Sequence, residues 1–510
     1  MDSTDLGKQI VDLSQTQKIA TQFRDESDST RSLLKATVWL ESICRTPGFT
    51  VAQRFDSVDL LDTSTRKHQK QIGDDYLGLL HANRKQEKLL WETAHGFWTA
   101  LSAGYLECME QLHKNPASAD KLKAKLPVLA ARGARAVAMQ IKWVLFRFGM
   151  VEPQVWADLA HCQQFAEARK IDGQAVSLYL SNQTKSCPNE EFLRAVMLSA
   201  ASMDSLSVME QEIADRWIDY FASTFKVDAK AHKALNLFFD LDRASAPSRV
   251  AGETGSNPHR RYFGASDALP QMQEYLESTH KTGATPVPFR LPKGGEMTHV
   301  VKVLEHLMLH WGEAPPSREW DRRFTATTIE VKHDYGSVRQ ALADMEQGVL
   351  DFTDVIAIRP EYWIVDNAGR GGYRAIVPKG LRAWLRLGAL IAMRLEFREF
   401  WSIAVIRRVE TDEHQQRKVG IRMIARKPVT ALMRSKLRAS TQDRPELGIL
   451  LNAKPSRAGG VHMLMRPGTF ALNEDIDITF GPNETTWSLT PSRMVEKAVD
   501  YDWVRYTLKS

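Results

Sequence analysis

The chain has 510 residues, a length that favours about two to four domains, each able to bury its own apolar core. Hydrophobic residues make up 43% and charged residues 25%, which excludes a generally disordered chain. The formal net charge of +6 is too small for this length to indicate nucleic-acid binding, so only a local basic cluster would be informative.

The amino terminus predicts a protein that is not exported, because Met1–Asp5 is polar and acidic and no basic segment followed by an apolar one is found there. The most apolar stretches, 126–150 and 381–395, are interrupted by arginine and lysine, so we expect no membrane span. The four cysteines lack the spacing of a zinc site. We therefore expect reduced thiols, a cytoplasmic location and no bound metal or cofactor.

Residues 1–243 predict an all-α helical domain, because apolar residues recur every three or four positions and proline is sparse up to about Phe239. A largely buried helix is expected over Val128–Phe148. A second helical stretch is expected from about Asn189 to Phe225, with a break near Met203.

Residues 244–296 are rich in Ser, Gly, Pro and Thr, and this composition predicts a linker. A connecting segment, 297–316, follows, with an amphipathic helix over Met297–Trp311. His306 and His310 lie one turn apart on it, but the glutamate of a zincin motif is missing. We interpret these histidines as core or solvated side chains.

Residues 317–438 change to alternating β-branched and aromatic residues, which predicts consecutive antiparallel strands around one helix-like insertion near Val338–Gly348. The strands are expected near 327–331, 355–365, 373–377, 389–397, 402–409 and 418–425. Residues 439–510 predict a β-rich extension or a second small β-domain. The predicted fold class is therefore multidomain α+β, with an amino-terminal all-α domain, an antiparallel β-barrel and a β-rich tail.

The most unusual local sequence is the turn after the strand that ends near Val365, where Asp366, Asn367 and Ala368 lead into a glycine-dense stretch. Consecutive glycines let a planar or anionic ligand approach the backbone. Asp366 offers acceptors for the N–H edge of a guanine, and Arg370 offers a donor fork for a phosphate. A plain hairpin turn is the alternative interpretation.

Three arginines, Arg318, Arg322 and Arg323, precede the first predicted strand of the same region. Guanidinium groups stack on purines and bind phosphate through two hydrogen bonds, which suits a guanine nucleotide. Ion pairs to Glu319 and Asp321 are the alternative. The candidate ligand-binding residues are Arg318, Arg322, Arg323, Asp366, Asn367, Ala368, Gly369, Arg370 and Gly371.

These two segments resemble the PilZ family, whose members bind cyclic di-GMP with an RxxxR stretch before the barrel and a [D/N]xSxxG turn within it. Arg318 and Arg322 match the first motif, and Asp366, Ala368 and Gly371 fall on the second. The resemblance covers roughly residues 318–428 and implies a PilZ-like barrel. Ala368 replaces the serine of the motif, and the interval between the motifs is longer than usual. Losing one neutral hydrogen bond would cost about 0.5–1.5 kcal/mol, or about tenfold in affinity.

The resemblance implies a cyclic di-GMP-binding effector that couples the nucleotide to contacts between the helical domain and a protein partner. A ligand-free adaptor that acts through protein contacts is the first alternative. An RNA-associated protein that uses the basic run Arg417–Arg438 is the second, although a solvated basic face fits that run better. No GxSxG, P-loop, HExxH or GxGxxG motif occurs in a catalytic context, so we expect no enzyme.

Overall fold

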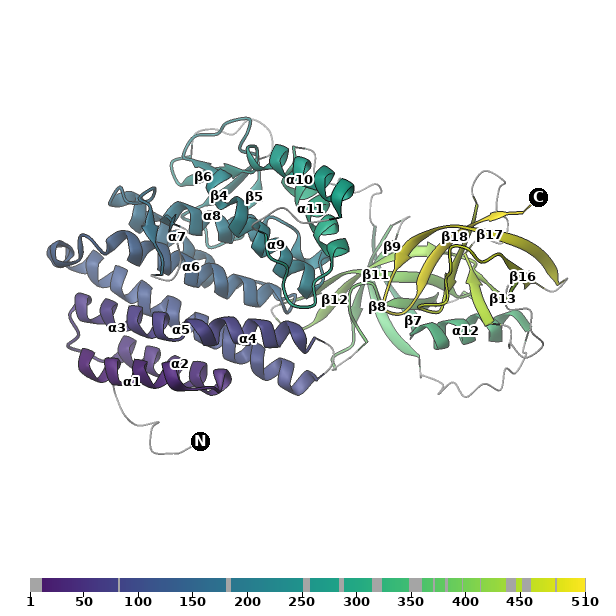
Figure 1. Ribbon diagram of the computed structural model, residues 1–510, viewed down its shortest axis with the longest axis horizontal. Helices are drawn as coiled ribbons and strands as arrows, with labels where there is room; N and C mark the ends of the chain where they lie inside the picture. The colour runs from purple at the N-terminus through teal and green to yellow at the C-terminus, as the bar shows by residue number, and fades with distance from the viewer. Residues whose placement is uncertain are drawn as a thin grey trace. The chain divides into compact units, whose positions relative to one another are not determined.

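The chain divides into two compact units, Met1–Ser317 and Arg318–Ser510. The fold is taken from a computed structural model, in which helices dominate the first unit and strands the second (Figure 1). The structure describes residues 12–80, 83–179, 185–250, 257–283, 289–313, 323–347, 360–369, 372–380, 384–396, 398–412, 414–436, 446–451, 460–481 and 484–509.

The first unit begins with a series of helices, and side-chain caps start several of them. Asp12 and Asp28 accept the N–H groups of Gln15 and Arg31, which otherwise lack partners at a helix start. The helices are α1 Leu13–Asp25, α2 Ser29–Arg45, α3 Val51–Ser64, α4 Arg66–Gly78, α5 Arg84–Lys114, α6 Leu126–Leu145, α7 Pro153–Ala168, α8 Pro188–Ser199 and α9 Val208–Phe221. Short 3-10 turns lie at Pro116–Leu122, Met203–Ser205 and Ala222–Thr224.

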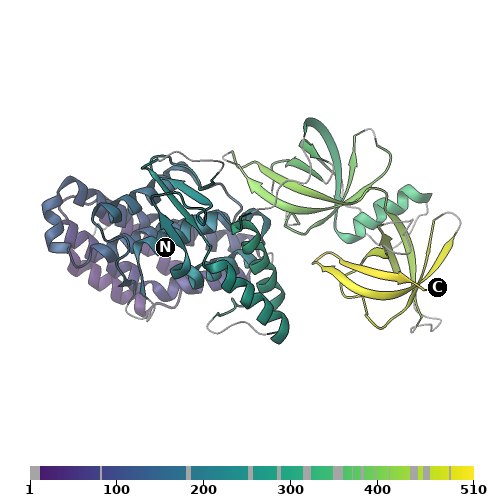
Figure 2. The same ribbon diagram turned by 90° about the horizontal axis from the view of Figure 1, so that it is seen from above.

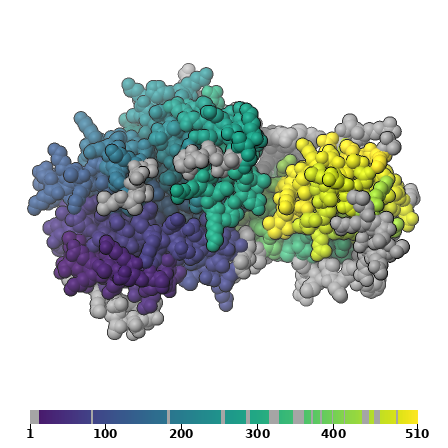
Figure 3. Space-filling view, in the orientation of Figure 1, coloured from purple at the N-terminus to yellow at the C-terminus, as the bar shows by residue number. Residues whose placement is uncertain are grey.

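Helix α6 is the central element of this unit, because it is buried along most of its length and contacts α5, α7 and α8. The predicted buried helix is thereby confirmed, shifted by two or three residues. The predicted break near Met203 is also confirmed, since α8 and α9 are separate helices there. Figure 3 shows the early helices, in purple, and the later elements, in teal, meeting along one continuous surface.

Residues 244–296 differ from the expected linker. They hold strand β5 (Ser248–Arg249), strand β6 (Arg260–Gly264) and helix α10 (Ala268–Thr282). β5 and β6 join β3 (Lys226–Asp228) and β4 (Leu237–Asp240) in an antiparallel sheet of order β3-β6-β4-β5, and β1 (Val176–Ser177) pairs with β2 (Lys185–Ser186). Met272 and Leu276 of α10 are buried in the helical core, because their spacing of four residues makes an apolar face that the polar composition obscures.

Helix α11 (Met297–Trp311) lies on α9 and α10 at the bounds predicted for the connecting helix. His306 is largely buried, and its Nε2 lies 2.6 Å from the carbonyl oxygen of Ala201. Burial lowers the pKa of His306, which favours the neutral ring. Within the described ranges, no three side chains of the metal-binding types gather closely enough to hold a metal ion.

The second unit contains two closed antiparallel barrels of six strands each. The first barrel has the order β10-β11-β12-β9-β8-β7 and the second the order β13-β14-β15-β18-β17-β16. The strands are β7 Arg323–His333, β8 Glu361–Gly369, β9 Gly372–Val377, β10 Leu390–Leu395, β11 Ser402–Thr411, β12 Arg417–Ala425, β13 Val429–Ser435, β14 Glu446–Leu450, β15 Val461–Met465, β16 Ile476–Phe480, β17 Thr485–Lys497 and β18 Asp502–Leu508. The predicted fold class is confirmed.

Helix α12 (Tyr335–Gln347) connects β7 to β8 of the first barrel but packs against both barrels (Figure 2). Its buried residues Val338 and Leu342 belong to the same apolar cluster as Ile403 of the first barrel and Ile449 of the second. The hydroxyl of Tyr335 also donates to backbone carbonyls of the second barrel. The two barrels therefore share one core through this helix.

The boundary between the barrels falls between Ala425 and Val429, earlier than the expected end of the barrel at residue 438. The basic run 417–438 is consequently divided between β12 of the first barrel and β13 of the second. Lys418 is paired with Asp412 at 3.2 Å, and Lys436 with Asp477 at 3.0 Å. The charged residues of this run alternate with inward-facing residues along two strands of different barrels, so the run does not form one surface.

In the described part of the chain, no helix is both long enough and apolar enough to cross a lipid bilayer.

Candidate site at the end of the first barrel

The predicted site lies where β7 begins, β8 ends and β9 begins. The backbone of Arg323 is paired with Ala368, and that of Gly369 with Gly372. The end of the arginine stretch and the turn that follows Asp366 are thus brought side by side by strand pairing. Four of the predicted residues, Arg318, Arg322, Arg370 and Gly371, lie outside the described residues, and Arg323 is placed by its backbone alone.

Asp366 occupies a β-bulge in the pairing of β8 with β9. Val365 is paired with Ala375 and Asn367 with Arg374, so Asp366 is the extra residue. A bulge re-aims a side chain without ending the strand. The carboxylate of Asp366 accepts hydrogen bonds from Nε of Arg374 at 2.9 and 3.1 Å and forms an ion pair with its Nη2 at 2.9 Å. These hydrogen bonds raise the pKa of the Arg374 guanidinium. Asp366 is therefore held in one position by a charged partner.

Asn367 is buried, with 8% of its surface exposed, and lies directly across from Arg374. Opposed residues of an antiparallel pair share a face of the sheet, so Asn367 faces the same side as Arg374. Its Oδ1 is buried and accepts no hydrogen bond from any residue that the structure describes. An unpaired buried acceptor costs about 1–3 kcal/mol, which a ligand N–H group would recover.

A row of arginines continues from this pair across the barrel. Arg374 is opposite Gly420 on β12, and Gly420 is opposite Arg408 on β11. Arg422, two residues beyond Gly420, is exposed and lies opposite Gly372. Since residues two apart on a strand share a face, Arg374, Arg408 and Arg422 lie on one side of the sheet around Gly420.

The two central positions, Gly372 and Gly420, have no side chains, and this lets the neighbouring strands and side chains approach closely. A Cβ on Gly372 would lie 1.9 Å from the carbonyl oxygen of Ile421, and one on Gly420 would lie 2.9 Å from Cβ of Arg408. Any larger residue would force strands apart or displace the arginine. The surface thus offers guanidinium groups around two positions without side chains, an arrangement suited to phosphate oxygens and to a flat ring.

Three of these arginines, Arg374, Arg408 and Arg422, are absent from the residues predicted from the sequence. Arg374 could have been found, because it follows the glycine turn at a spacing of two from Gly372. Arg408 and Arg422 come from β11 and β12, and their proximity depends on strand register that no local motif records.

A family model described as the amino-terminal domain of the cyclic-di-GMP receptor FimW matches residues 21–232, which is less than half of the chain. The matched segment lies within the first, helical unit and does not reach either barrel. No curated protein matches the chain.

Proposed function

We propose that the protein is a cyclic di-GMP-binding regulatory effector. The nucleotide binds on the outer face of the first barrel, at the end of β8, and changes the contacts that the helical unit makes with a protein partner. The matched family is named for a cyclic-di-GMP receptor, and the residues of the second unit resemble the PilZ motifs. Both arguments lead to the same ligand from different parts of the chain.

The observation that carries the proposal is the unpaired Oδ1 of Asn367 beside the Asp366–Arg374 pair. A guanine base presents N–H donors on its edge, and these suit the acceptors of Asn367 and Asp366. Arg422 and Arg374 supply guanidinium groups for the two phosphates. Arg323, the last of the predicted arginines, has its backbone opposite Ala368.

The Asp366–Arg374 ion pair sets a condition on binding, because both oxygens of Asp366 already face a cation. The ligand must share this carboxylate with Arg374 or move the guanidinium toward a phosphate. Exchange of one charged partner for another costs little if the new geometry is equally good. Ala368 cannot supply the hydroxyl of the PilZ motif, so the affinity is expected to be about tenfold below that of a serine-containing site.

The proposed role is regulatory and needs no catalytic group, cofactor or metal. We also propose a cytoplasmic location. All four cysteines are free thiols, as is usual in a reducing compartment.

The test is isothermal titration of cyclic di-GMP into the full chain, with Arg422→Ala as the main variant and GTP as a competing nucleotide. Removing one charged hydrogen-bond donor costs about 1.5–3 kcal/mol, so we expect binding to weaken about ten- to a hundredfold. Arg493→Ala is the matched control, because Arg493 is an exposed arginine on β17 of the second barrel. Equal weakening by both variants, or no binding at about 50 μM, would refute the proposal.

A ligand-free adaptor is the second candidate, favoured by two exposed apolar side chains next to Asp366. Tyr362 and Ile364 of β8 are 60% and 54% exposed. Together with the closed Asp366–Arg374 pair, they suit contact with another protein. The same titration separates the candidates, since this one predicts no heat from cyclic di-GMP. Arg417–Arg438, the run that an RNA-associated protein would use, is divided between two barrels, and this makes that alternative the weakest.

A further inference from the structure

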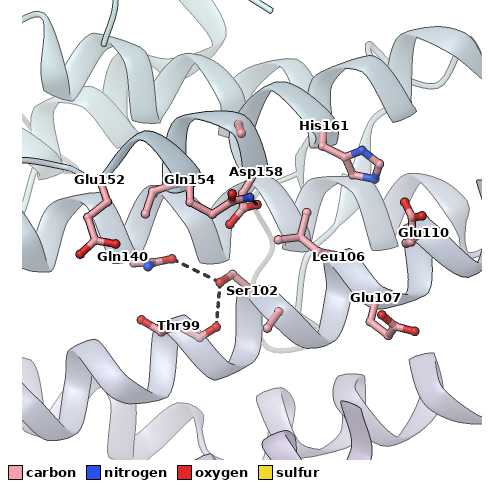
Figure 4. Close-up of a pocket in the computed structure, with 13 residues that line it drawn as sticks. Thr99, Ser102, Leu106, Glu107, Glu110, Gln140, Glu152, Gln154, Asp158 and His161 are labelled. Atoms are coloured by element: carbon pink, nitrogen blue, oxygen red, sulfur yellow. Dashed lines mark hydrogen bonds between the residues drawn. The ribbon is translucent and has the colours of Figure 1, made fainter. Parts of the chain in front are cut away.

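A cavity of about 640 Å³ opens in the helical unit. It is lined by α5 and α7, and Gln140 of α6 lies in its floor (Figure 4). Its acidic lining residues are Glu107 and Glu110 from α5, Glu152 just before α7, and Asp158 from α7. All of them lie in segments that the family match covers.

The acidic groups of this pocket are short of cationic partners. Glu110 is paired with Lys114 at 3.2 Å. Glu107 and Asp158 accept hydrogen bonds only from the neutral amides of Gln111 and Gln154. Glu107, Glu152 and Asp158 form no ion pair with Lys or Arg in the part of the chain that the structure describes. Burial raises the pKa of Asp158, so a cation bound nearby would relieve a cost that the folded chain already carries.

The floor of the pocket holds an unused hydrogen-bond donor. Gln140 is 8% exposed, and its Oε1 accepts from the hydroxyl of Ser102, which also lies 2.9 Å from the carbonyl oxygen of Thr99 (Figure 4). The Nε2 group of Gln140 makes no hydrogen bond to any described residue, although it lines the pocket. At one end of the pocket, Nε2 of His161 is buried and has no hydrogen-bond partner within the described ranges. These two nitrogen atoms can therefore form hydrogen bonds with a carbonyl or amide group of another molecule.

The pocket is elongated. Its lining runs along α5 from Thr99 to Glu110, about 16 Å at 1.5 Å per residue. An extended peptide of about five residues spans the same length. A single metal ion or a lone ammonium group would leave most of this space empty. The chain as a whole carries a net charge of +6, so attraction of a cation must come from these local carboxylates and not from the overall field.

We propose that this pocket binds a short basic peptide segment of a partner protein. Its cationic side chains lie against Glu107, Glu152 and Asp158, and a backbone carbonyl accepts from Nε2 of Gln140. The inference does not depend on cyclic di-GMP, because neither the pocket nor its test involves the barrels.

The test is a fluorescence anisotropy titration of a labelled hexa-arginine peptide with the full chain, in the absence of nucleotide. We expect saturable binding that Glu152→Gln/Asp158→Asn weakens about tenfold or more. The matched control is Glu41→Gln/Glu92→Gln, which removes two exposed acids that lie outside the pocket. Gln140→Leu keeps every charge, and we expect it to weaken binding about fivefold through the lost hydrogen bond. Circular dichroism establishes that each variant is folded.

Three outcomes would overturn the inference. One is the absence of binding by the wild-type chain, and another is an equal loss in the pocket and control variants, which means unspecific attraction. The third is binding of spermine with the same dependence on Glu152 and Asp158 while hexa-arginine fails, which would assign the pocket to a small polyamine.

Discussion

Asp215 is the carboxylate whose loss we expect to cost the helical unit most. It is buried, and it accepts from Arg194 through Nε at 3.0 Å and Nη2 at 2.7 Å, and from Nζ of Lys142 at 2.7 Å. These three side chains join α6, α8 and α9 inside the segment that the family model matches. The substitution Asp215→Asn keeps the shape of the side chain and removes its charge, so that two buried cations lose their common partner.

Breaking a buried ion pair from one side costs about 3–5 kcal/mol, because the remaining charge stays buried. Lys142 retains Glu212 at 2.6 Å, and Arg194 retains Asp219. We therefore expect the lower end, about 3 kcal/mol. At about 1.5 °C per kcal/mol for a unit of 317 residues, the melting temperature should fall by about 4–5 °C.

The dependence of the unfolding free energy on pH in the acid range should change as well. Burial alone raises the pKa of Asp215, but Arg194 and Lys142 outweigh this effect and hold the pKa well below its ordinary value. A lowered folded-state pKa supplies stability above the ordinary value of 3.8, and this stability is lost as the pH falls further. The difference in stability between wild type and Asp215→Asn should therefore stay constant down to about pH 4 and narrow as the pH falls below the ordinary value of 3.8.

Thermal unfolding followed by circular dichroism at the helical band reports on the first unit, where most helices lie. The control is Glu41→Gln, which removes an exposed i,i+4 pair with Arg45 and should cost no more than about 0.5 kcal/mol. If Asp215→Asn melts within about 2 °C of this control, the buried network does not stabilise the unit as argued.

Three further substitutions or reactions test other parts of the fold. In Gly372→Ala the new Cβ meets the carbonyl of Ile421, so we expect a loss of about 1–3 kcal/mol in urea unfolding of the barrel, and an unchanged midpoint would contradict the close approach. Leu342→Ala on α12 should cost about 2–5 kcal/mol and lower the melting of both barrels together, whereas the exposed Met345→Ala should change little; separate barrel transitions would argue against a shared core. Burial raises the pKa of Cys108, so this thiol should react with Ellman's reagent only after denaturant is added, and rapid labelling of the native chain would show that the site opens.

The periodicity of apolar residues was sufficient to predict the long helices and most barrel strands. A helix or strand that buries one face carries its apolar residues at the regular spacing of that face. It failed for β13 (Val429–Ser435), which lies inside a basic run that we interpreted as a surface and not as a strand. The residues between its charges, Ala431 and Met433, are buried in the second barrel. The ordinary alternation of inward and outward residues in β13 was therefore not recognised, because the surrounding run is rich in charged residues.

The candidate site could be predicted only where its residues are close in sequence. Asp366 and the glycine turn were recognisable from the local motif. The bulge that gives Asp366 to Arg374 and the pairing that places Arg422 beside Gly372 depend on register across three strands, which is set by the packing of the whole barrel. The acceptor of Asn367 lacks a partner because of how the folded chain buries it, and no pattern of residues in the sequence predicts this.

The sharing of α12 between the barrels also has a consequence for synthesis of the chain. Leu342 leaves the ribosome well before Ile449, Leu464 and Tyr501, the buried residues that the second barrel contributes to its cluster. At about 5–20 residues per second, the roughly 160 residues to Tyr501 take about 8–30 s. During that time the apolar face of α12 has only its own barrel to cover it. The nascent chain thus leaves part of the apolar face of α12 uncovered until its last strands appear.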